Sequence, residues 1–422
     1  MSMIHKSIYH KGGYMVRTHK ELFFHYSLNQ GLHWFSLGII IPVMILAFLD
    51  FGFDIGQIGI AMAVMSTTVL LLELPTGGLA DTLGRKRIYI IAVFFYVAGY
   101  SLLLFASAFI HLIAVVVLVG IGRALSSGTI DAWFIDEHKR LGGDDEHLQQ
   151  DLAKAGIVIP AALGVGTLAG GFIPDITGSF RSNIVILIAL YCLQMLLTAV
   201  LIKENRADFN GRLSDGFRQF PRVLSSAVKY GIRQRNTLVI LIATAALGIG
   251  LSGLEQLWQP RVRGISPETG TWFLGVLSTG YFLAAAAGSG VSTGVLKLFR
   301  QNYGMFLFCF RLLMAVFYIA LSFVFSLGAF MPLYFILFFF HGITGSPEMT
   351  IFNRDIPSGK RSSLLSLNSL FLQAGGVMGS VAAGQIALRL SIPAAWRLAG
   401  GLLAASAFVY LFIKEKVSEN RI

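Results

Sequence analysis

Four ionisable residues interrupt otherwise apolar segments of the sequence, namely the acids Glu73, Asp131 and Glu348 and the base Arg123. A charged side chain in the middle of a membrane span costs about 3 kcal/mol, so such residues usually serve a function. Burial favours the neutral form of a carboxyl group, whereas a nearby arginine favours the ionised form. A mobile pair of an acid and an arginine can therefore take up and release a proton, and we predict this chemistry for these four residues.

The three acids are predicted to lie at a similar depth. Each falls within about two helical turns of the same end of its apolar segment, at about 1.5 Å per residue, which permits a shared chamber. Arg123 lies about 12 Å along the helix axis from Asp131 at that rise and has no helical neighbour of opposite charge. Its partner is therefore expected on another helix or in a substrate.

The composition indicates an integral membrane protein, because hydrophobic residues make up 55% of the chain, charged residues 13%, and the mean hydropathy is +0.70. These values lie far from the balance of soluble domains. Apolar segments of about 20 residues predict membrane-spanning helices. The twelve predicted spans are 27–49, 57–80, 87–107, 110–135, 153–174, 183–202, 237–257, 270–295, 303–326, 329–352, 363–388 and 393–413.

Lys and Arg residues gather in the N-terminal tail, in every second loop and in the C-terminal tail. This distribution is typical of cytoplasmic segments, so we predict a multi-pass protein of the plasma membrane with both termini in the cytoplasm. The same distribution explains the net charge of +11. Without an aromatic platform or a binding motif, these bases do not indicate a nucleic-acid partner.

The long loop at 203–236 divides the spans into two groups of six, as in transporters built from duplicated halves that bind substrate between them. When the fourth and tenth spans are aligned, Gly128 meets Gly345 and Asp131 meets Glu348. The predicted fold is therefore all-α with two pseudo-symmetric halves. The predicted parts are a tail at 1–26, a bundle at 27–202, a linker with an amphipathic helix at 203–236, a bundle at 237–413 and a tail at 414–422.

A charged segment with the sequence GLADTLGRK, from Gly78 to Lys86, separates the second and third predicted spans. It resembles the signature of the Major Facilitator Superfamily. The resemblance implies a twelve-helix fold that transports by alternating access. It also implies a charge latch, in which the signature residues meet an acid at the end of the fourth helix and the N-terminus of the eleventh. The residues assigned to the latch are Gly78, Asp81, Gly84, Arg85, Lys86 and Asp136.

Two further features resemble subgroups of that family. Arg123, followed by Gly128, is similar to the fourth-helix arginine motif of proton-coupled members, although the glutamine of that motif is missing. The run Glu-x-Pro-x-Gly that begins at Glu73 looks like that of exporter-like members. Polar residues on the first and eleventh spans are either cavity lining or packing contacts, and the candidates are Asn29, His33, Trp34, Asn368, Ser369 and Gln373.

Two other charges receive structural predictions. Glu255 lies at the end of the seventh span, where a salt bridge with Arg261 or Arg263 is expected at the mouth of the protein. Arg311 is expected to extend its head group to the membrane surface while its stem stays in the apolar region.

The surplus of acids over bases in the spans favours a neutral or cationic substrate, because carriers of anions need convergent Arg or Lys residues. We therefore predict a monomeric, proton-driven exporter of small amphipathic compounds such as drugs or antibiotics. The alternatives are a proton-coupled carrier of a polar metabolite such as a sugar, and a lipid translocator of the same fold. No enzyme, cofactor or metal motif is recognised. The expected partners are the lipid bilayer and a small-molecule substrate, with the proton gradient as energy source.

Overall fold

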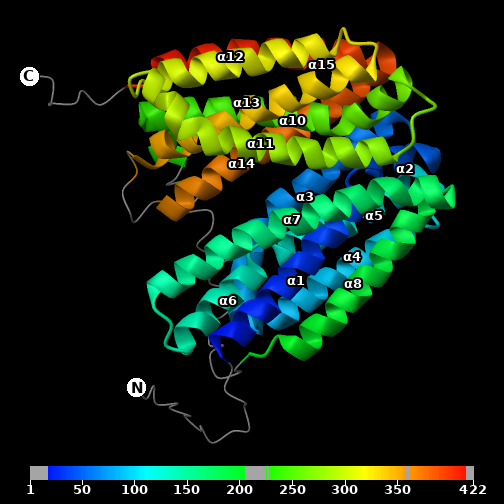
Figure 1. The fold of residues 1–422 in the computed structure, drawn as a ribbon, viewed down its shortest axis with the longest axis vertical. Coiled ribbons are helices and arrows are strands. Elements are labelled where there is room, and N and C mark those ends of the chain that lie inside the picture. Colours follow the sequence, from blue (N-terminus) through cyan, green and yellow to red (C-terminus); the bar gives the residue numbers. More distant parts are fainter. Residues whose placement is uncertain (1–17, 205–224, 226–227, 355, 357–360, 415–422) are drawn as a thin grey trace, which may run out of the picture.

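The computed structural model describes residues 18–204, 225, 228–354, 356 and 361–414, and the side chains of 73–82 and 361–363 lie outside this description. The N-terminal half contains α1 (His19–Ile40), α2 (Met44–Asp50), α3 (Ile55–Leu83), α4 (Arg85–Leu103), α5 (Phe109–Ser126), α6 (Thr129–Arg140), α7 (Asp145–Thr177) and α8 (Arg181–Leu201). The C-terminal half contains α10 (Arg235–Ile265), α11 (Trp272–Leu298), α12 (Tyr303–Leu321), α13 (Leu327–Arg354), α14 (Arg361–Arg389), α15 (Ile392–Ala407) and the 3₁₀ helix η3 (Phe408–Phe412). Figure 1 shows the two halves stacked one above the other.

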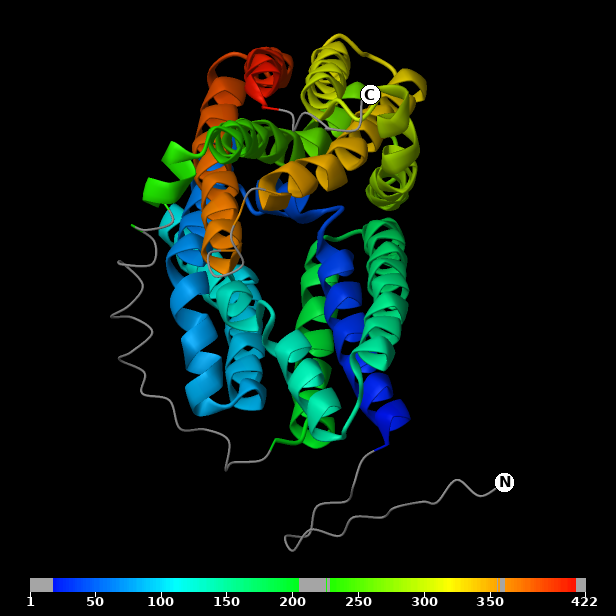
Figure 2. The ribbon, with the colours of Figure 1, turned by 90° about the vertical axis from the view of Figure 1, so that its left-hand side faces the viewer.

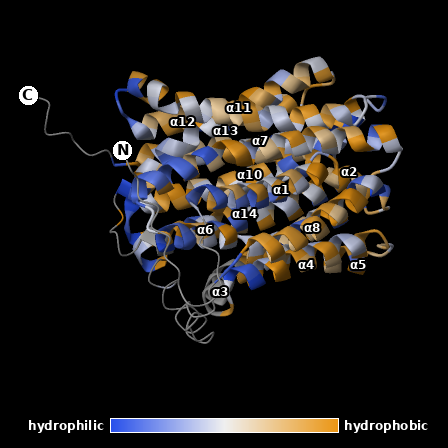
Figure 3. Cartoon of the chain, turned by 60° about the horizontal axis from the view of Figure 1, so that its bottom comes forward, coloured by the Kyte–Doolittle hydropathy of each residue, from blue (hydrophilic) through white to orange (hydrophobic). Residues whose placement is uncertain are grey.

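In the described part of the chain, eleven helices are long and apolar enough to cross a membrane, or twelve if α1 and α2, which meet at 46°, form one bent span. Apolar residues run along the helices, and hydrophilic residues gather at the helix ends on the side of the two termini (Figure 3). The structure confirms the predicted all-α membrane architecture. The amphipathic helix expected in the linker falls mainly on 205–224, outside the described residues, as do 1–17 and 415–422 of the predicted tails.

The first helix begins eight residues earlier than the predicted span, at His19 rather than residue 27. Thr18 caps it, because its side-chain oxygen accepts a hydrogen bond from the Glu21 amide at 3.2 Å, and the Glu21 carboxylate accepts one from the Thr18 amide at 3.3 Å. Such a reciprocal pair satisfies two amide groups that have no partner inside the helix. The first helix therefore begins within the segment predicted as the N-terminal tail.

The fourth predicted span is broken in the middle. α5 ends at Ser126 and α6 begins at Thr129, because Gly128 adopts a left-handed conformation with φ of 65° and ψ of −3°. The aligned Gly345 lies inside the continuous helix α13. The break therefore distinguishes the two halves, and it places Asp131 in the first turn of a new helix rather than two turns along the helix that carries Arg123.

Replacing Gly128 with Ala should lower the free energy of unfolding by about 1–2 kcal/mol, since L-residues other than Gly pay this cost in the left-handed region. A Cβ at this position meets no atom within 4 Å, so the loss would come from the backbone alone. Asn, which tolerates this conformation, should cost less. Gly345 also has open space around it, and Gly345→Ala should instead stabilise a helix interior. Thermal unfolding of the purified variants in detergent measures all three changes, and equal effects at the two glycines would contradict the explanation.

Glycines bring helices of each half into close contact. A Cβ on Gly38 of α1 would lie 2.7 Å from the Leu163 carbonyl oxygen of α7, and a Cβ on Gly248 of α10 would lie 2.2 Å from that of Leu372 of α14. Small residues allow this approach, which is common in membrane helix packing. α1 with α7 and α10 with α14 are equivalent pairs in the two halves.

The two halves meet at one end of the molecule. α7 and α11 approach each other near α2 and diverge towards the ends of the helices on the side of the two termini (Figures 1 and 2). Among the described residues, the hydrogen bonds between the halves lie at the end near α2, which we name the closed end, and continue along α7 and α11 to the Thr279 hydroxyl, which donates to the Gly164 carbonyl at 3.1 Å. Asp175 accepts hydrogen bonds from the amides of Thr271 and Trp272, each at 2.7 Å, and Gln259 donates to the Ile41 carbonyl at 2.8 Å.

Candidate functional site

Asp131 on α6 is bound by two neutral donors from α1. The Tyr26 hydroxyl and the Gln30 amide both donate to Asp131 Oδ1, at 2.7 and 2.6 Å. The Tyr26 ring is fixed by stacking on Phe134, with ring centroids 4.2 Å apart. Among the described residues no Lys, Arg or His forms an ion pair with this acid. Asp131 is thus a half-buried carboxyl group that is oriented by hydrogen bonds and not neutralised by a cation.

His33 of α1 is packed among tyrosine rings of its half. The His33 ring lies 6.0–6.3 Å from the rings of Tyr89, Tyr96 and Tyr191 in an aromatic cluster of α1, α4 and α8. His33 was predicted to line the substrate cavity and Arg123 to take part in proton coupling, and both roles stay predictions.

The Arg123 side chain is exposed, and in the described part of the chain it forms neither a hydrogen bond nor an ion pair. It lies one turn before Ser126, whose hydroxyl is 3.1 Å from that of Tyr96. The side chain of Glu73, which was predicted to belong to the same group of charges, lies outside the description. An accessible and unpaired guanidinium can meet a group of opposite charge that approaches from the space between the halves.

Glu255 on α10 differs from its prediction. Arg261 donates instead to the Val324 carbonyl at 2.6 Å, and Arg263 to the Pro267 carbonyl at 2.7 Å, so the expected salt bridge at the mouth is absent from these described residues. The Glu255 side chain is accessible and unpaired within the described chain.

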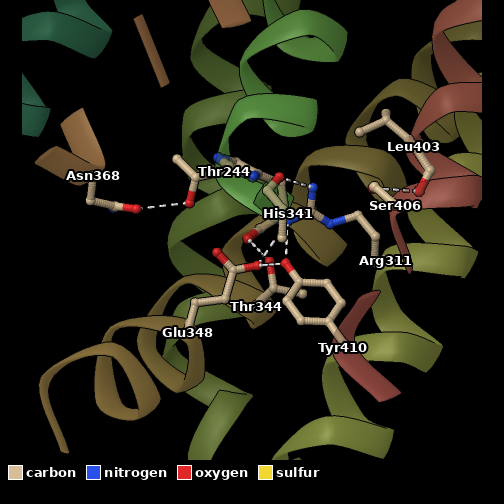
Figure 4. Close-up of polar contacts among 10 residues, drawn as sticks. Thr244, Arg311, His341, Thr344, Glu348, Asn368, Leu403, Ser406 and Tyr410 are labelled. Atoms are coloured by element: carbon tan, nitrogen blue, oxygen red, sulfur yellow. Dashed lines mark hydrogen bonds and ion pairs between the residues drawn. The ribbon is translucent and has the colours of Figure 1, made fainter. Parts of the chain in front are cut away.

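Arg311 also corrects its prediction, because it is completely buried rather than extended to the membrane surface. Its guanidinium donates to Glu348 at 2.8 Å and to the Tyr410 hydroxyl at 2.6 Å, and it contacts the Ala243 carbonyl at 3.3 Å. The Tyr410 hydroxyl donates to the same Glu348 oxygen. Figure 4 shows these side chains converging from α12, α13 and η3. We name Arg311, Glu348 and Tyr410 the buried triad.

The buried triad changes the interpretation of Glu348. A carboxylate held by a fully buried arginine inside the C-terminal half is a packing element of that half. Asp131 belongs to a separate network in the N-terminal half. Asp131 and Glu348 thus have different partners in the two halves, and the side chain of the third acid, Glu73, lies outside the description.

The latch residues that the structure describes lie together at the end opposite the closed end. Arg85 Nη1 is 2.7 Å from Asp136 Oδ2, as the resemblance implies. Gly84, with φ of 95°, forms the tight turn between α3 and α4, and Lys86 donates to the Ala199 carbonyl at 2.6 Å. Gly78 and Asp81 fall in the 73–82 segment, whose side chains lie outside the description.

Glu204 completes the latch and was missed by the sequence analysis. Its carboxylate accepts a hydrogen bond from the Arg85 amide at 2.7 Å, at the N-terminus of α4, where negative charge is favourable. Burial raises the pKa of Glu204, and the amides of Arg85 and Lys86 oppose the rise. Its place three residues after the sixth span gave no signal, because only the fold brings that loop to α4.

The polar cavity candidates divide into two groups. Asn29 is buried and hydrogen-bonded to Thr198 at 2.8 Å and to Gln194 at 2.9 Å, so of the two roles predicted for it these contacts favour packing. Asn368 accepts a hydrogen bond from Thr244 at 3.0 Å (Figure 4). The second group consists of Trp34, Ser369 and Gln373. Their side chains are half-buried and form no hydrogen bond with any described residue.

Tyr26 and Gln30 were also missed. They lie four residues apart, which places them on one face of α1, and this spacing was a usable signal for a shared polar partner. Tyr410 and Arg311 gave no comparable signal, because 99 residues separate them in the chain.

Comparisons with known proteins agree with this architecture. The family model of the Major Facilitator Superfamily matches residues 26–380. An uncharacterized MFS-type transporter of Bacillus subtilis, YxaM, is 22% identical over 240 residues, which are 57% of this chain and 58% of that relative. The match thus spans less than two thirds of the relative's length.

Solved structures share the fold at low sequence identity. The nucleoside transporter NupG superposes with a TM-score of 0.75 at 12% identity, covering 92% of this chain and 98% of that one. The human organic anion transporter MFSD10 gives a TM-score of 0.58 at 15% identity, covering 94% of this chain and 100% of that one. Since the family model covers most of the sequence, the chain belongs to the Major Facilitator Superfamily and is a multi-pass secondary transporter rather than an enzyme.

Proposed function

We propose that this transporter exports small amphipathic compounds, neutral or cationic, in exchange for protons. The observation that carries the proposal is the setting of Asp131, a carboxyl group within a span that is held by Tyr26 and Gln30 without a cationic partner among the described residues. An acid with neutral donors can gain or lose a proton without breaking a salt bridge. Titratable carboxyl groups in such positions are typical of proton relays in transporters.

The distribution of buried charge supports a neutral or cationic cargo. Within the described residues, Glu348 neutralises Arg311 inside the C-terminal half, so that arginine is not free to bind an anion. Arg123 is a single base, whereas anion carriers need several convergent bases. Glu255 supplies an accessible negative charge on the opposite half.

We infer that the end opposite the closed end faces the cytoplasm, because the latch, the N-terminus of α1 and the residues near Lys414 all lie there. The excess of Lys and Arg in the loops of that side supports this orientation. The molecule then represents an inward-facing state, in which the site between the halves is reached from the cytoplasm. An exporter would load its cargo in this state.

Proton flux in proteoliposomes that contain a pH-sensitive dye tests the proposal. Wild-type protein is given lipophilic cations, neutral amphipathic antibiotics and sugars in turn. We expect one of the two amphipathic classes to evoke proton movement, and Asp131→Asn to reduce it by at least about tenfold, in line with the loss of a proton-transfer group. The matched control is Asp145→Asn, since Asp145 is exposed in the first turn of α7.

Two results would contradict the proposal. Proton flux evoked by sugars alone would favour the polar-metabolite carrier. Transport of an amphipathic compound at equal rates by wild type and Asp131→Asn, without proton movement, would favour a uniporter or a lipid translocator.

A further inference from the structure

Two opposite charges remain unsatisfied in the space between the halves. Arg123 of α5 and Glu255 of α10 are both accessible, and in the described part of the chain neither forms a hydrogen bond or an ion pair. The other charged groups treated above are satisfied, Asp131 by Tyr26 and Gln30 and Glu348 by Arg311. An unpaired charge is costly when a site closes and excludes water.

The two charges belong to different halves but face the same region. Gln256, which follows Glu255 directly, donates to the Ile55 carbonyl of α3 at 3.3 Å, so this part of α10 lies against the N-terminal half. Arg123 lies one turn after Gly120 of α5, and a Cβ on Gly120 would lie 3.0 Å from Thr68 of the same helix α3, so both charges border α3. A molecule between the halves can therefore touch both side chains at once.

Aromatic rings pack one helical turn from each pole, since the Trp258 ring lies 5.8 Å from that of Tyr334 and the Ser126 hydroxyl lies 3.1 Å from that of Tyr96. Near Glu255, the Tyr281 ring stacks on Phe338 with centroids 4.5 Å apart, and it meets Tyr334 edge-on at 6.0 Å. Near Arg123, Tyr96 stacks on Tyr191 at 4.9 Å. Aromatic faces attract ammonium groups and pack against apolar bodies. Tyr281 is half-buried, whereas the other four rings are buried in the two halves. Of these rings, Tyr281 is therefore the one that can meet the aromatic or aliphatic body of a bound compound.

We propose that Glu255 and Arg123 form a two-pole substrate site for a small ampholyte, with Glu255 binding its ammonium group and Arg123 its anionic group. The inference deepens the function proposed above and rests on it, because it assigns the cargo to net-neutral compounds that carry both charges. Arginine matches a carboxylate with two parallel hydrogen bonds. A cation alone would leave Arg123 unpaired as the halves close, and an anion alone would leave Glu255 unpaired.

Three probes with the same aromatic ring and side-chain length separate the poles: phenethylamine carries the ammonium group, 3-phenylpropionate the carboxylate, and phenylalanine both. Binding is measured as the rise in melting temperature of purified protein in detergent over a range of probe concentrations. We expect phenylalanine to act at a concentration at least about tenfold below that of either single-charge probe, since a charged hydrogen bond contributes this much to affinity.

Charge-neutral variants assign each pole. In Glu255→Gln, phenylalanine should bind no better than 3-phenylpropionate, and in Arg123→Gln no better than phenethylamine. Both positions are unpaired, so neither change should lower the melting temperature without probe. The charge-swapped double variant Arg123→Glu/Glu255→Arg should recover the preference for phenylalanine. Glu268→Gln, a change at an exposed loop residue, is the control and should behave as wild type.

The outcomes separate this inference from proton coupling. Asp131→Asn should keep the preference for phenylalanine while losing proton flux. If the wild-type protein binds phenylalanine but moves no protons, the proposed proton coupling is wrong and the two-pole site is not affected. Equal binding of the three probes, no response to any of them at millimolar concentration, or an unchanged preference in both single variants would overturn the two-pole site.

Discussion

Glu348→Gln should lower the free energy of unfolding by about 3–5 kcal/mol, the usual loss when one partner of a buried ion pair is removed. Arg311 is 0% exposed, and its charge would remain buried opposite a neutral amide. Tyr410, which donates to the same carboxylate, would lose a charged acceptor as well. Unfolding in mixed micelles, followed by circular dichroism, measures the change.

A double-mutant cycle distinguishes the buried triad from a proton-binding site. Arg311→Met alone should also destabilise, whereas Arg311→Met with Glu348→Leu should lose less than the sum of the single changes by about 0.5–3 kcal/mol, because neither charge is then left alone. The control is Arg397→Met, since Arg397 is exposed and lies over the Phe323 ring at 5.4 Å. Additive losses at 311 and 348, or loss of proton coupling in Glu348→Gln at unchanged stability, would contradict the structural role.

The membrane architecture could be predicted from the sequence because its signals are local. Apolar segments of span length and the loops between them follow directly from hydropathy. The contact between Arg85 and Asp136, at 2.7 Å, was reachable because the charged signature specifies both the arginine and the kind of acid that it meets. The contact between the Arg85 amide and Glu204 could not be predicted, because no sequence pattern relates residues that are 119 positions apart.

Charge partners inside the bundle could not be predicted, because depth along a helix says nothing about which face a residue occupies. Arg311 was placed at the membrane surface by its position alone, yet its face of α12 meets α13 and η3. Glu255 was paired with Arg261 by proximity in sequence, whereas both side chains turn to other surroundings. Rotation about the helix axis is set by packing between helices and is not visible in hydropathy.

The repeat between the halves was recognised, but its divergence was not. Asp131 and Glu348 align in sequence, yet Asp131 binds neutral donors and Glu348 binds a buried arginine. Gly128 breaks its helix while Gly345 continues one. The N-terminal half holds its acid with neutral donors, and the C-terminal half uses the equivalent acid to hold its helices together. This difference is what assigns proton coupling to the N-terminal half in our proposal.

Gly171→Val should open the closed end. A Cβ on Gly171 of α7 would lie 2.7 Å from the Gly275 amide nitrogen of α11, a backbone atom that cannot move without its helix. Overpacking of this kind costs about 1–3 kcal/mol. The cost falls only on the state in which the halves touch at this end. The substitution should therefore shift the equilibrium between the two states by roughly 5- to 150-fold towards the state that is open at this end. Transport should fall by at least about tenfold, since a cycle needs both states.

Cysteine labelling measures this opening directly. Thr279 hydrogen-bonds to Thr167 across the junction at 2.7 Å, so a Thr279→Cys reporter, with Cys192 and Cys309 replaced, is protected while the end is closed. Gly171→Val should raise its labelling by an impermeant maleimide by at least about tenfold, in proportion to the population shift. The matched control is Gly156→Val on the same helix, where a Cβ meets nothing within 4 Å. Only Gly171→Val is expected to push the halves apart. Equal labelling of the reporter in the Gly171→Val and Gly156→Val proteins would therefore mean that the Gly171 contact does not close this end.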